Sequence, residues 1–338
     1  ALVRTTFRSA LFLLAPLLTR AAMSTSSCAN SITLNDGHQH PTVGYGTYKV
    51  GVVPASASSA VAAGSIETDG VDPAACVATA LKLGYRFLDC AEFYANEKAV
   101  GEGIVRSGVP RSELFLASKV WTTTIHAGPE AVQAQLEKTL ADLGTEYLDL
   151  FCIHWPVPGK HVEAYKQLEK AQAAGQIRSL GVSNYAVEDY KELMETATVK
   201  PVINQIEINP FLFRKQTIAF FESEGVKLQS YRTLRDGKAF EDPAIVSIAA
   251  KHGKSAAQVL GRWCVQHGFI AIPKSTKEHR MAENLAIFDF VLDDADMEQL
   301  DSMTTPGAIA KFVELYRKCV VRDTPLGIEL AKTTITEA

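Results

Sequence analysis

Eight apolar, strand-like runs alternate with helical segments along most of the chain, and this alternation limits the folds open to it. The runs cover residues 43–47, 86–90, 114–119, 147–154, 177–183, 202–208, 226–231 and 269–273. An apolar period predicts helices over residues 130–143 and 162–174, each followed by a glycine that would stop it. Eight strand–helix units favour a closed barrel of parallel strands over an open sheet. We therefore expect an α/β protein, specifically a (β/α)8 TIM barrel.

The segments around the barrel units predict a single domain over residues 30–338 of the 338-residue chain. Near its start, Asn35-Asp36-Gly37 predicts a β-hairpin with a type I′ turn, which we expect to plug one barrel end. Residues 51–70 form an Ala- and Ser-rich loop insertion, either a lid or a disordered segment, and a C-terminal tail begins at about residue 304. Residues 1–22 lack acidic side chains and suit a transit peptide, a poor signal sequence or a translated upstream segment outside the fold.

Charge and cysteine usage restrict the partners and the compartment. The formal net charge is −4 with the charges interspersed, so we expect neither nucleic acid nor membrane as a partner. The 6 cysteines form no CxxC pair, which favours a reducing compartment. We expect a cytoplasmic monomer with a small-molecule substrate, or an organellar protein if residues 1–22 are a transit peptide.

Polar side chains end several of the strand-like runs, where barrel chemistry is normally found. Asp89, Lys119 and His154 end the second, third and fourth runs, and Tyr94 follows Asp89 closely. A tyrosine acts as an acid near neutral pH if a cation lowers its pKa from about 10, and Lys119 with Asp89 as counter-charge is expected to do so. His154 would orient a substrate carbonyl.

Each of these residues alone also has a structural explanation, because Lys–Asp pairs, packed tyrosines and strand-end histidines are common. Their joint placement favours an enzyme.

Two other motifs are better explained by structure. Gly44-Tyr45-Gly46 lacks the third glycine and the helix of a dinucleotide fingerprint, so it is interpreted as the first strand. His38-Gln39-His40 has no metal-ligand partner in suitable spacing, so we expect an exposed turn and no metal site.

Several motifs together resemble the aldo-keto reductase family over about residues 32–302, in particular short-loop members such as 2,5-diketogluconate reductase or prostaglandin F synthase-like enzymes. They are Asp89-Cys-Ala-Glu-Phe-Tyr94, Ser118-Lys119-Val-Trp121, Ile153-His154-Trp155-Pro156, Gly181-Val-Ser-Asn184, Asn204-Gln205-Ile-Glu207 and Ile272-Pro273-Lys274-Ser275-Thr276. The resemblance implies a catalytic tetrad of Asp89, Tyr94, Lys119 and His154. It implies reduction of aldehydes and ketones by hydride transfer from NADPH, with Tyr94 as the general acid.

The same resemblance assigns a cofactor site. Ser183, Asn184 and Gln205 match positions that bind the nicotinamide carboxamide, and Tyr231 matches the aromatic residue beneath its ring. The adenosine end is expected at Lys274, Ser275, Thr276, Arg280, Glu283 and Asn284. Cations beside a hydroxyl suit a 2′-phosphate, which favours NADPH over NADH.

This chain departs from the family pattern at Arg232, which replaces a small residue and either pairs with the cofactor pyrophosphate or crowds it. Tyr48 stands where tryptophan is frequent, and residues 235–242 predict a short rim loop and an open pocket. Tyr48, Trp121 and Trp155 are expected to line an apolar substrate pocket suited to unhindered aldehydes, α-dicarbonyls or aromatic carbonyls. The alternatives are a cofactor-binding redox sensor or structural protein on the same barrel, and a metal-dependent barrel hydrolase.

Overall fold

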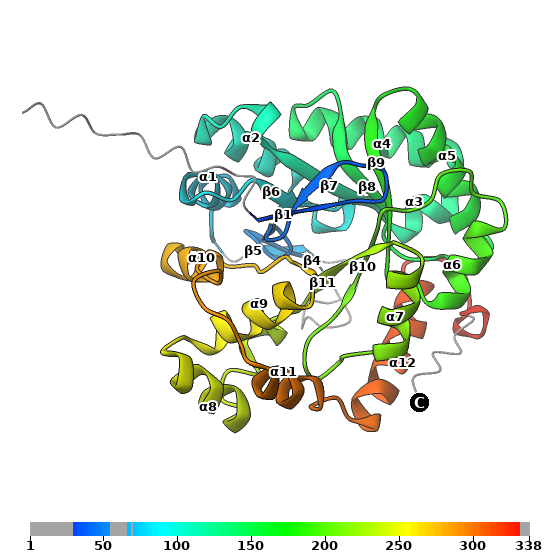
Figure 1. Ribbon diagram of the computed structural model, residues 1–338. Coiled ribbons are helices and arrows are strands. Elements are labelled where there is room, and N and C mark those ends of the chain that lie inside the picture. Colours follow the sequence, from blue (N-terminus) through cyan, green and yellow to red (C-terminus); the bar gives the residue numbers. More distant parts are fainter. Residues whose placement is uncertain (1–29, 55–65, 69, 332–338) are drawn as a thin grey trace, which may run out of the picture.

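Eight parallel strands form one curved sheet in the computed structural model, which describes residues 30–54, 66–68 and 70–331. The strands are β3 (Tyr45–Gly46), β6 (Phe87–Asp89), β7 (Phe115–Val120), β8 (Leu148–Ile153), β9 (Ile177–Ser183), β10 (Ile203–Glu207), β11 (Lys227–Tyr231) and β12 (Ile270–Ala271). The sheet closes because Gly44 N–H donates to Ala271 O at 2.8 Å and Ala271 N–H donates to Thr42 O at 2.9 Å. The predicted (β/α)8 barrel is confirmed, and Figure 1 shows helices surrounding the strands.

Helices follow the strands, as the alternation predicts. They are α1 (Pro73–Leu83), α2 (Glu97–Ser107), α3 (Thr122–Ala127), α4 (Pro129–Leu143), α5 (His161–Ala173), α6 (Val187–Met194), α7 (Lys215–Ser223), α8 (Pro243–His252), α9 (Ala256–Gln266), α10 (Glu278–Leu285), α11 (Asp294–Asp301) and α12 (Pro306–Val320). Short 3-10 helices are η1 (Glu92–Tyr94), η2 (Arg111–Glu113), η3 (Arg235–Gly237) and η4 (Ile328–Leu330). Gly144 ends α4 in the left-handed conformation at φ 66°, which confirms the predicted glycine stop.

The glycine pair of the first strand serves close packing at the barrel seam. A Cβ atom on Gly46 would lie 2.8 Å from the main-chain oxygen of Ile272, which leaves no room for a side chain. The Gly46 N–H instead donates to Pro273 O at 3.1 Å. Gly44-Tyr45-Gly46 is therefore part of the barrel, as predicted, and not a phosphate-binding turn.

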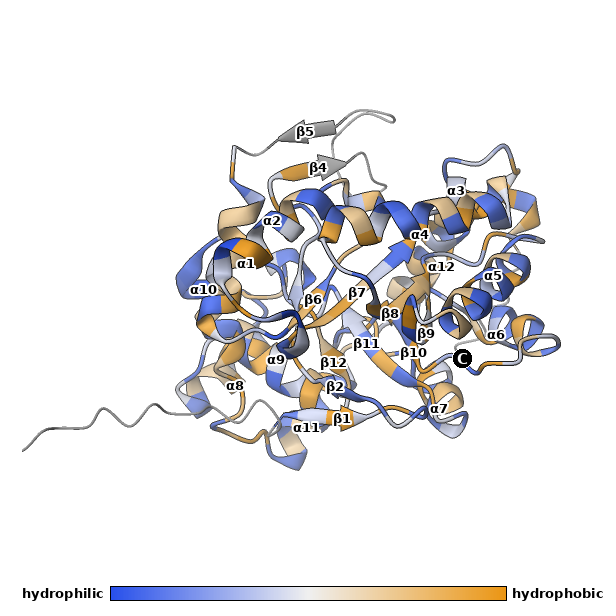
Figure 2. Cartoon of the chain, turned by 90° about the horizontal axis from the view of Figure 1, so that it is seen from above, coloured by the Kyte–Doolittle hydropathy of each residue, from blue (hydrophilic) through white to orange (hydrophobic). Residues whose placement is uncertain are grey.

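An N-terminal hairpin of β1 (Ser31–Thr33) and β2 (Gln39–Pro41) lies across one end of the barrel, opposite β4 (Val52–Pro54), as Figure 2 shows. The plug is confirmed, but the predicted type I′ turn is wrong. Only Gly37 has a positive φ in the turn, whereas type I′ requires it at both central residues. The Leu34 N–H donates to His38 O at 2.9 Å, so the loop is longer than a two-residue turn.

The expectation that His38-Gln39-His40 is an exposed turn is wrong for His40. Its side chain is fully buried in β2, with its ring centroid 4.6 Å from that of Phe87 and 4.1 Å from that of Phe115. Burial of the ring lowers the pKa of His40 to about 3, so the imidazole is neutral. Closure of the barrel end by the hairpin is what removes this histidine from water.

The described parts of the two segments that interrupt the strand–helix rhythm contain strands and helices. Within the insertion at 51–70, β4 pairs antiparallel with β5 (Ile66–Thr68), while residues 55–65 and 69 lie outside the described residues, as do residues 1–22. The C-terminal tail supplies α12, whose Phe312 and Tyr316 join an apolar cluster with Trp121 and Trp155. The tail therefore crosses the catalytic rim. Among the residues that the structure describes, no helix is long and apolar enough to cross a membrane.

Candidate active site

A cavity of about 940 Å³ opens at the carboxyl ends of the barrel strands. Nine of the ten residues expected at the nicotinamide and adenosine ends of the cofactor line it. So do three of the four expected catalytic residues, all but the buried Lys119, and all three expected substrate-pocket aromatics. Strand ends, rim loops and the C-terminal segment thus contribute to one space, as barrel architecture predicts.

Lys119 connects the proposed acid to its counter-charge at the floor of this cavity. Its Nζ donates to Asp89 Oδ1 at 2.7 Å, to the Cys90 main-chain oxygen at 2.8 Å and to the Tyr94 phenol oxygen at 3.2 Å. All of these side chains are buried. A buried ammonium group is tolerated here because three acceptors surround it.

Local backbone structure carries Tyr94 from the end of β6 to this position. The chain turns through η1 directly after Asp89, and Ala95 ends that turn in the left-handed conformation at φ 55°. Asn96 then donates from Nδ2 to the main-chain oxygens of Thr47 at 2.9 Å and Val50 at 3.1 Å. The Tyr94 loop is thereby tied to the loop that follows β3.

The expectation that Lys119 lowers the pKa of Tyr94 is wrong for this structure. Burial of the phenol raises its pKa well above the usual value, and the negative charge of Asp89 raises it further. Lys119 is paired with Asp89, and the carboxylate charge acts on the phenol in the opposite sense to the ammonium charge. Tyr94 therefore carries its proton at neutral pH.

His154 follows β8 and lies beside the phenol, with ring centroids 5.9 Å apart and ring planes at 83°. Burial lowers the pKa of His154 well below its usual value, and the charge of Lys119 acts in the same direction. A neutral imidazole beside a protonated phenol can bind a carbonyl oxygen without competing for its proton.

The residues expected at the nicotinamide form a connected hydrogen-bond group. Asn184 Nδ2 donates to the His154 main-chain oxygen and to Ser183 Oγ, both at 3.0 Å, and Asn184 Oδ1 accepts from the Tyr231 hydroxyl at 2.8 Å. Asn184 has φ 59°, so its loop turns sharply after β9. These contacts hold the side chains of the group in fixed orientations at the cavity.

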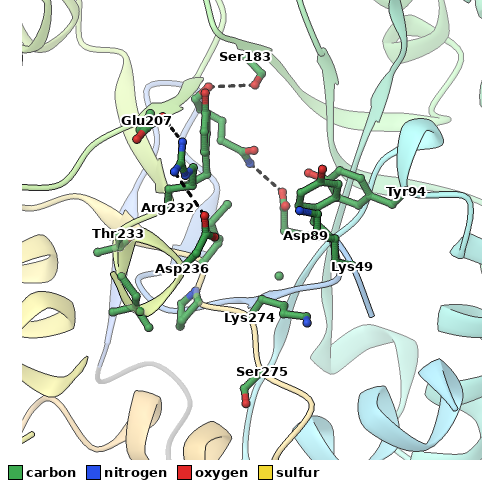
Figure 3. Close-up of a pocket in the computed structure, with 18 of the residues that line it drawn as sticks. Lys49, Asp89, Tyr94, Ser183, Glu207, Arg232, Thr233, Asp236, Lys274 and Ser275 are labelled. Atoms are coloured by element: carbon green, nitrogen blue, oxygen red, sulfur yellow. Dashed lines mark hydrogen bonds and ion pairs between the residues drawn. The ribbon is translucent and has the colours of Figure 1, made fainter. Parts of the chain in front are cut away.

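Gln205 also contacts Asp89 of the expected catalytic group, a contact that sequence reasoning missed. Its Nε2 donates to Asp89 Oδ1 at 2.7 Å and to Gln229 Oε1 at 2.8 Å. The sequence could have indicated Gln229, because it lies two residues before Tyr231 on β11. Side chains two residues apart on a strand point to the same face of the sheet. Figure 3 shows the contact to Asp89 as a dashed line.

Arg232 lies between two carboxylates in Figure 3. Its guanidinium is 3.2 Å from Glu207 and 3.3 Å from Asp236. Burial raises the pKa of Glu207, and the charge of Arg232 partly offsets this. Sequence reasoning assigned no role to these two partners, which come from β10 and the rim loop.

The expected adenosine end lies at the start of α10. Lys274, Ser275, Arg280, Glu283 and Asn284 line the cavity, whereas Thr276 does not. The Tyr45 hydroxyl donates to the Ser275 main-chain oxygen at 2.7 Å and ties this loop to β3. Two cations beside a serine hydroxyl therefore lie in the same cavity as the catalytic group.

Aromatic side chains line the expected substrate side. The Trp121 ring stacks on Phe93 with centroids 4.0 Å apart, and Trp155 packs against Tyr316 of α12 at 5.6 Å. Trp121 Nε1 donates to Asp323 Oδ2 at 3.0 Å, so the C-terminal segment fixes this wall. The contribution of α12 to the pocket was not predicted, because no sequence pattern indicates where a terminal helix docks.

Comparison with known proteins agrees with this geometry. Residues 42–305 match the Aldo/keto reductase family. The chain is 39% identical over 278 residues to glyoxal reductase of Bacillus subtilis, covering 82% of this chain and 94% of that protein.

Solved structures of the family have the same fold. The aldo-keto reductase of Bombyx mori in complex with NADP superposes with a TM-score of 0.73 at 31% identity, covering 82% of this chain and 93% of that chain. The aldose reductase from Schistosoma japonicum gives 0.72 at 31% identity, with the same coverage of 82% and 93%. The chain therefore belongs to the aldo/keto reductase family and is an NADP-dependent oxidoreductase that reduces carbonyl groups.

Proposed function

We propose that Tyr94, Lys119, Asp89 and His154 carry out this reduction, with Tyr94 as the general acid. The observation that carries the proposal is the contact of Lys119 with both the phenol of Tyr94 and the carboxylate of Asp89 at the cavity floor. NADPH supplies the hydride when it is bound. Tyr94 donates the proton that converts the developing alkoxide into an alcohol, and neutral His154 orients the carbonyl oxygen.

The cavity has the groups that such a cofactor needs. Gln205, Asn184 and Ser183 offer amide and hydroxyl groups for a carboxamide, and Tyr231 offers a ring face. Lys274 and Arg280 suit a 2′-phosphate, with Ser275, Glu283 and Asn284 beside them. Arg232 is a candidate for the pyrophosphate if it leaves Asp236, its more exposed partner.

The aromatic walls support a substrate class of unhindered aldehydes, α-dicarbonyls and aromatic carbonyls. Tyr48, Trp121 and Trp155 line the cavity together with Phe312 of α12. The similarity to a glyoxal reductase supports the α-dicarbonyls among these. The cysteine usage supports a cytoplasmic location, which cell fractionation would test. Gel filtration would test whether the protein is a monomer.

The test is NADPH binding, followed by NADPH oxidation when glyoxal, methylglyoxal or benzaldehyde is added. We expect binding and turnover in the wild type, and binding without turnover in Tyr94→Phe. Binding by the wild type with no oxidation of any carbonyl would favour the cofactor-binding sensor or structural protein, an alternative that has no support among the relatives. Undiminished turnover in Tyr94→Phe would show that another group is the acid.

A further inference from the structure

A line of buried hydrogen bonds leads from the N-terminal hairpin through the barrel interior to the cavity. His40 Nδ1 lies 2.7 Å from the Pro41 main-chain oxygen, and His40 Nε2 lies 2.8 Å from Gln229 Nε2. Gln229 Oε1 accepts from Gln205 Nε2 at 2.8 Å. Gln205 and Gln229 are register partners on the neighbouring strands β10 and β11, so the backbone of the barrel fixes their spacing.

Chemistry fixes the direction of every bond in this line. The Pro41 carbonyl can only accept, so His40 Nδ1 carries the hydrogen and the neutral ring offers a lone pair at Nε2. Gln229 must then donate from Nε2, which turns its Oε1 toward Gln205. Gln205 must in turn donate from Nε2, and its second N–H goes to Asp89. The remaining polar atom of the Gln205 amide is Oε1, an acceptor, on a residue that lines the cavity.

We infer that Gln229 and His40 are positioning residues that hold Gln205 with its amide oxygen toward the cavity, as the acceptor for the N–H2 of the cofactor carboxamide. The inference rests on the proposed function, because it assigns a role toward the nicotinamide end of NADPH. Neither residue touches the cavity, and both act through Gln205. Exchange of the amide oxygen and nitrogen of Gln205 would place its oxygen, an acceptor, against two acceptor oxygens, Asp89 Oδ1 and Gln229 Oε1.

The packing around His40 supports its role in fixing the donor and acceptor direction of these hydrogen bonds. Phe87 and Phe115 enclose the imidazole, and the side chains of His40 and Gln229 are both fully buried. The enclosure keeps His40 neutral and prevents water from exchanging with its partners. A buried polar group destabilises the fold unless it has a hydrogen-bond partner. Only one donor–acceptor direction along this line pairs a donor with an acceptor at every bond.

The experiment compares the binding of NADPH with that of the reduced 3-acetylpyridine analogue, whose acetyl group has no N–H to donate. Dissociation constants are measured by fluorescence quenching. The wild type should bind NADPH about three- to tenfold more tightly than the analogue, the factor expected for one hydrogen bond to a buried acceptor. In Gln229→Met and His40→Met this preference should fall by at least about threefold, because the Gln205 amide loses one of its two anchors.

Two matched variants separate positioning from general damage. His40→Gln restores an acceptor for Gln229 and should keep the preference that His40→Met loses. Ser230→Ala removes a buried hydroxyl on the same strand, which bonds Ile208 O at 2.7 Å, and should leave the preference unchanged. If Gln229→Met does not fold, the two His40 variants decide the question.

An unchanged preference in Gln229→Met and His40→Met, in a wild type that binds NADPH and turns over carbonyls, would overturn this inference alone. A wild type that binds no NADPH would overturn the proposed function, and this inference with it.

Discussion

The ammonium group of Lys119 lies 3.2 Å from the phenol oxygen of Tyr94, and both side chains are buried. The same ammonium group donates to Asp89 at 2.7 Å. Burial and the charge of Asp89 raise the pKa of Tyr94 well above its usual value. The phenol of Tyr94 is therefore protonated at neutral pH, at the floor of the cavity.

Replacement of Tyr94, the proposed acid, should abolish most of the carbonyl reduction and leave NADPH binding intact. Tyr94→Phe removes the donor, so we expect kcat for carbonyl reduction to fall by about 10²–10⁴. Steady-state kinetics and NADPH titration measure the two effects. Tyr165→Phe is a suitable control, because it removes a buried hydroxyl that donates to Val199 O outside the cavity. Equal losses in the two variants would argue against a specific role for Tyr94.

Opposite pKa shifts predict different pH profiles for the two reaction directions. Tyr94 keeps its proton because its pKa is raised, and His154 stays neutral because burial lowers its pKa. We expect kcat for reduction to be flat between about pH 6 and 9, and kcat for alcohol oxidation to rise over that range as more phenolate forms. A fall in kcat for reduction centred near neutral pH, measured at saturating substrate and cofactor, would be inconsistent with these shifts.

Removal of one partner from the buried ion pair should cost more stability than removal of both. Lys119→Met leaves Asp89 as an uncompensated buried carboxylate, and we expect the free energy of unfolding to fall by about 3–5 kcal/mol. Adding Asp89→Asn to this variant should recover much of the loss, because no buried charge remains. Urea unfolding of the single and double variants measures the difference. A single variant as stable as the double variant would contradict the argument.

A second buried carboxylate should make stability depend on pH. Asp189 accepts from the Tyr316 hydroxyl at 2.6 Å and so ties α12 to α6, while burial raises the pKa of Asp189 to about 7. The unfolded value is about 3.9, so the folded state binds the proton more tightly, and this contribution is full below about pH 4 and lost as pH rises through 7. We therefore expect Asp189→Asn to flatten the decline in the free energy of unfolding between about pH 4 and 7.

Tyr316→Phe is the matched variant for this test. The Tyr316 hydroxyl favours the charged form of Asp189, so its removal should extend to higher pH the decline that Asp189→Asn flattens. Denaturant unfolding at several pH values would measure both slopes. Identical slopes in the wild type and the two variants would show that Asp189 does not titrate differently in the folded state.

Cofactor preference should depend on the cations at the start of α10. Arg280 and Lys274 line the cavity beside Ser275, and charge-assisted bonds to a 2′-phosphate contribute about 1.5–3 kcal/mol each. Arg280→Leu should therefore weaken NADPH about tenfold or more and leave NADH nearly unchanged. Dissociation constants for the two cofactors measure this. An equal loss for both would place Arg280 away from the phosphate.

Sequence patterns predicted the local structure well where a periodic signal exists. The predicted strand over 177–183 agrees with β9 (Ile177–Ser183), and the predicted helix over 130–143 is α4 within one residue. The hairpin turn was wrong because a single glycine at Gly37 permits more than one turn type. The insertion at 51–70 contains β4 and β5, whose pairing no alternation of apolar residues announced.

The sequence by itself determined the barrel and the strand ends on which Asp89, Lys119 and His154 stand, because apolar periodicity and strand–helix alternation are local properties of the chain. Only the tertiary structure decided how these groups behave. Burial of His40, the direction of the Gln205 amide and the raised pKa of Tyr94 depend on closure of the barrel, which removes water and brings together strands far apart in sequence. Desolvation and the choice of hydrogen-bond partner belong to the packed molecule, and no local pattern records them.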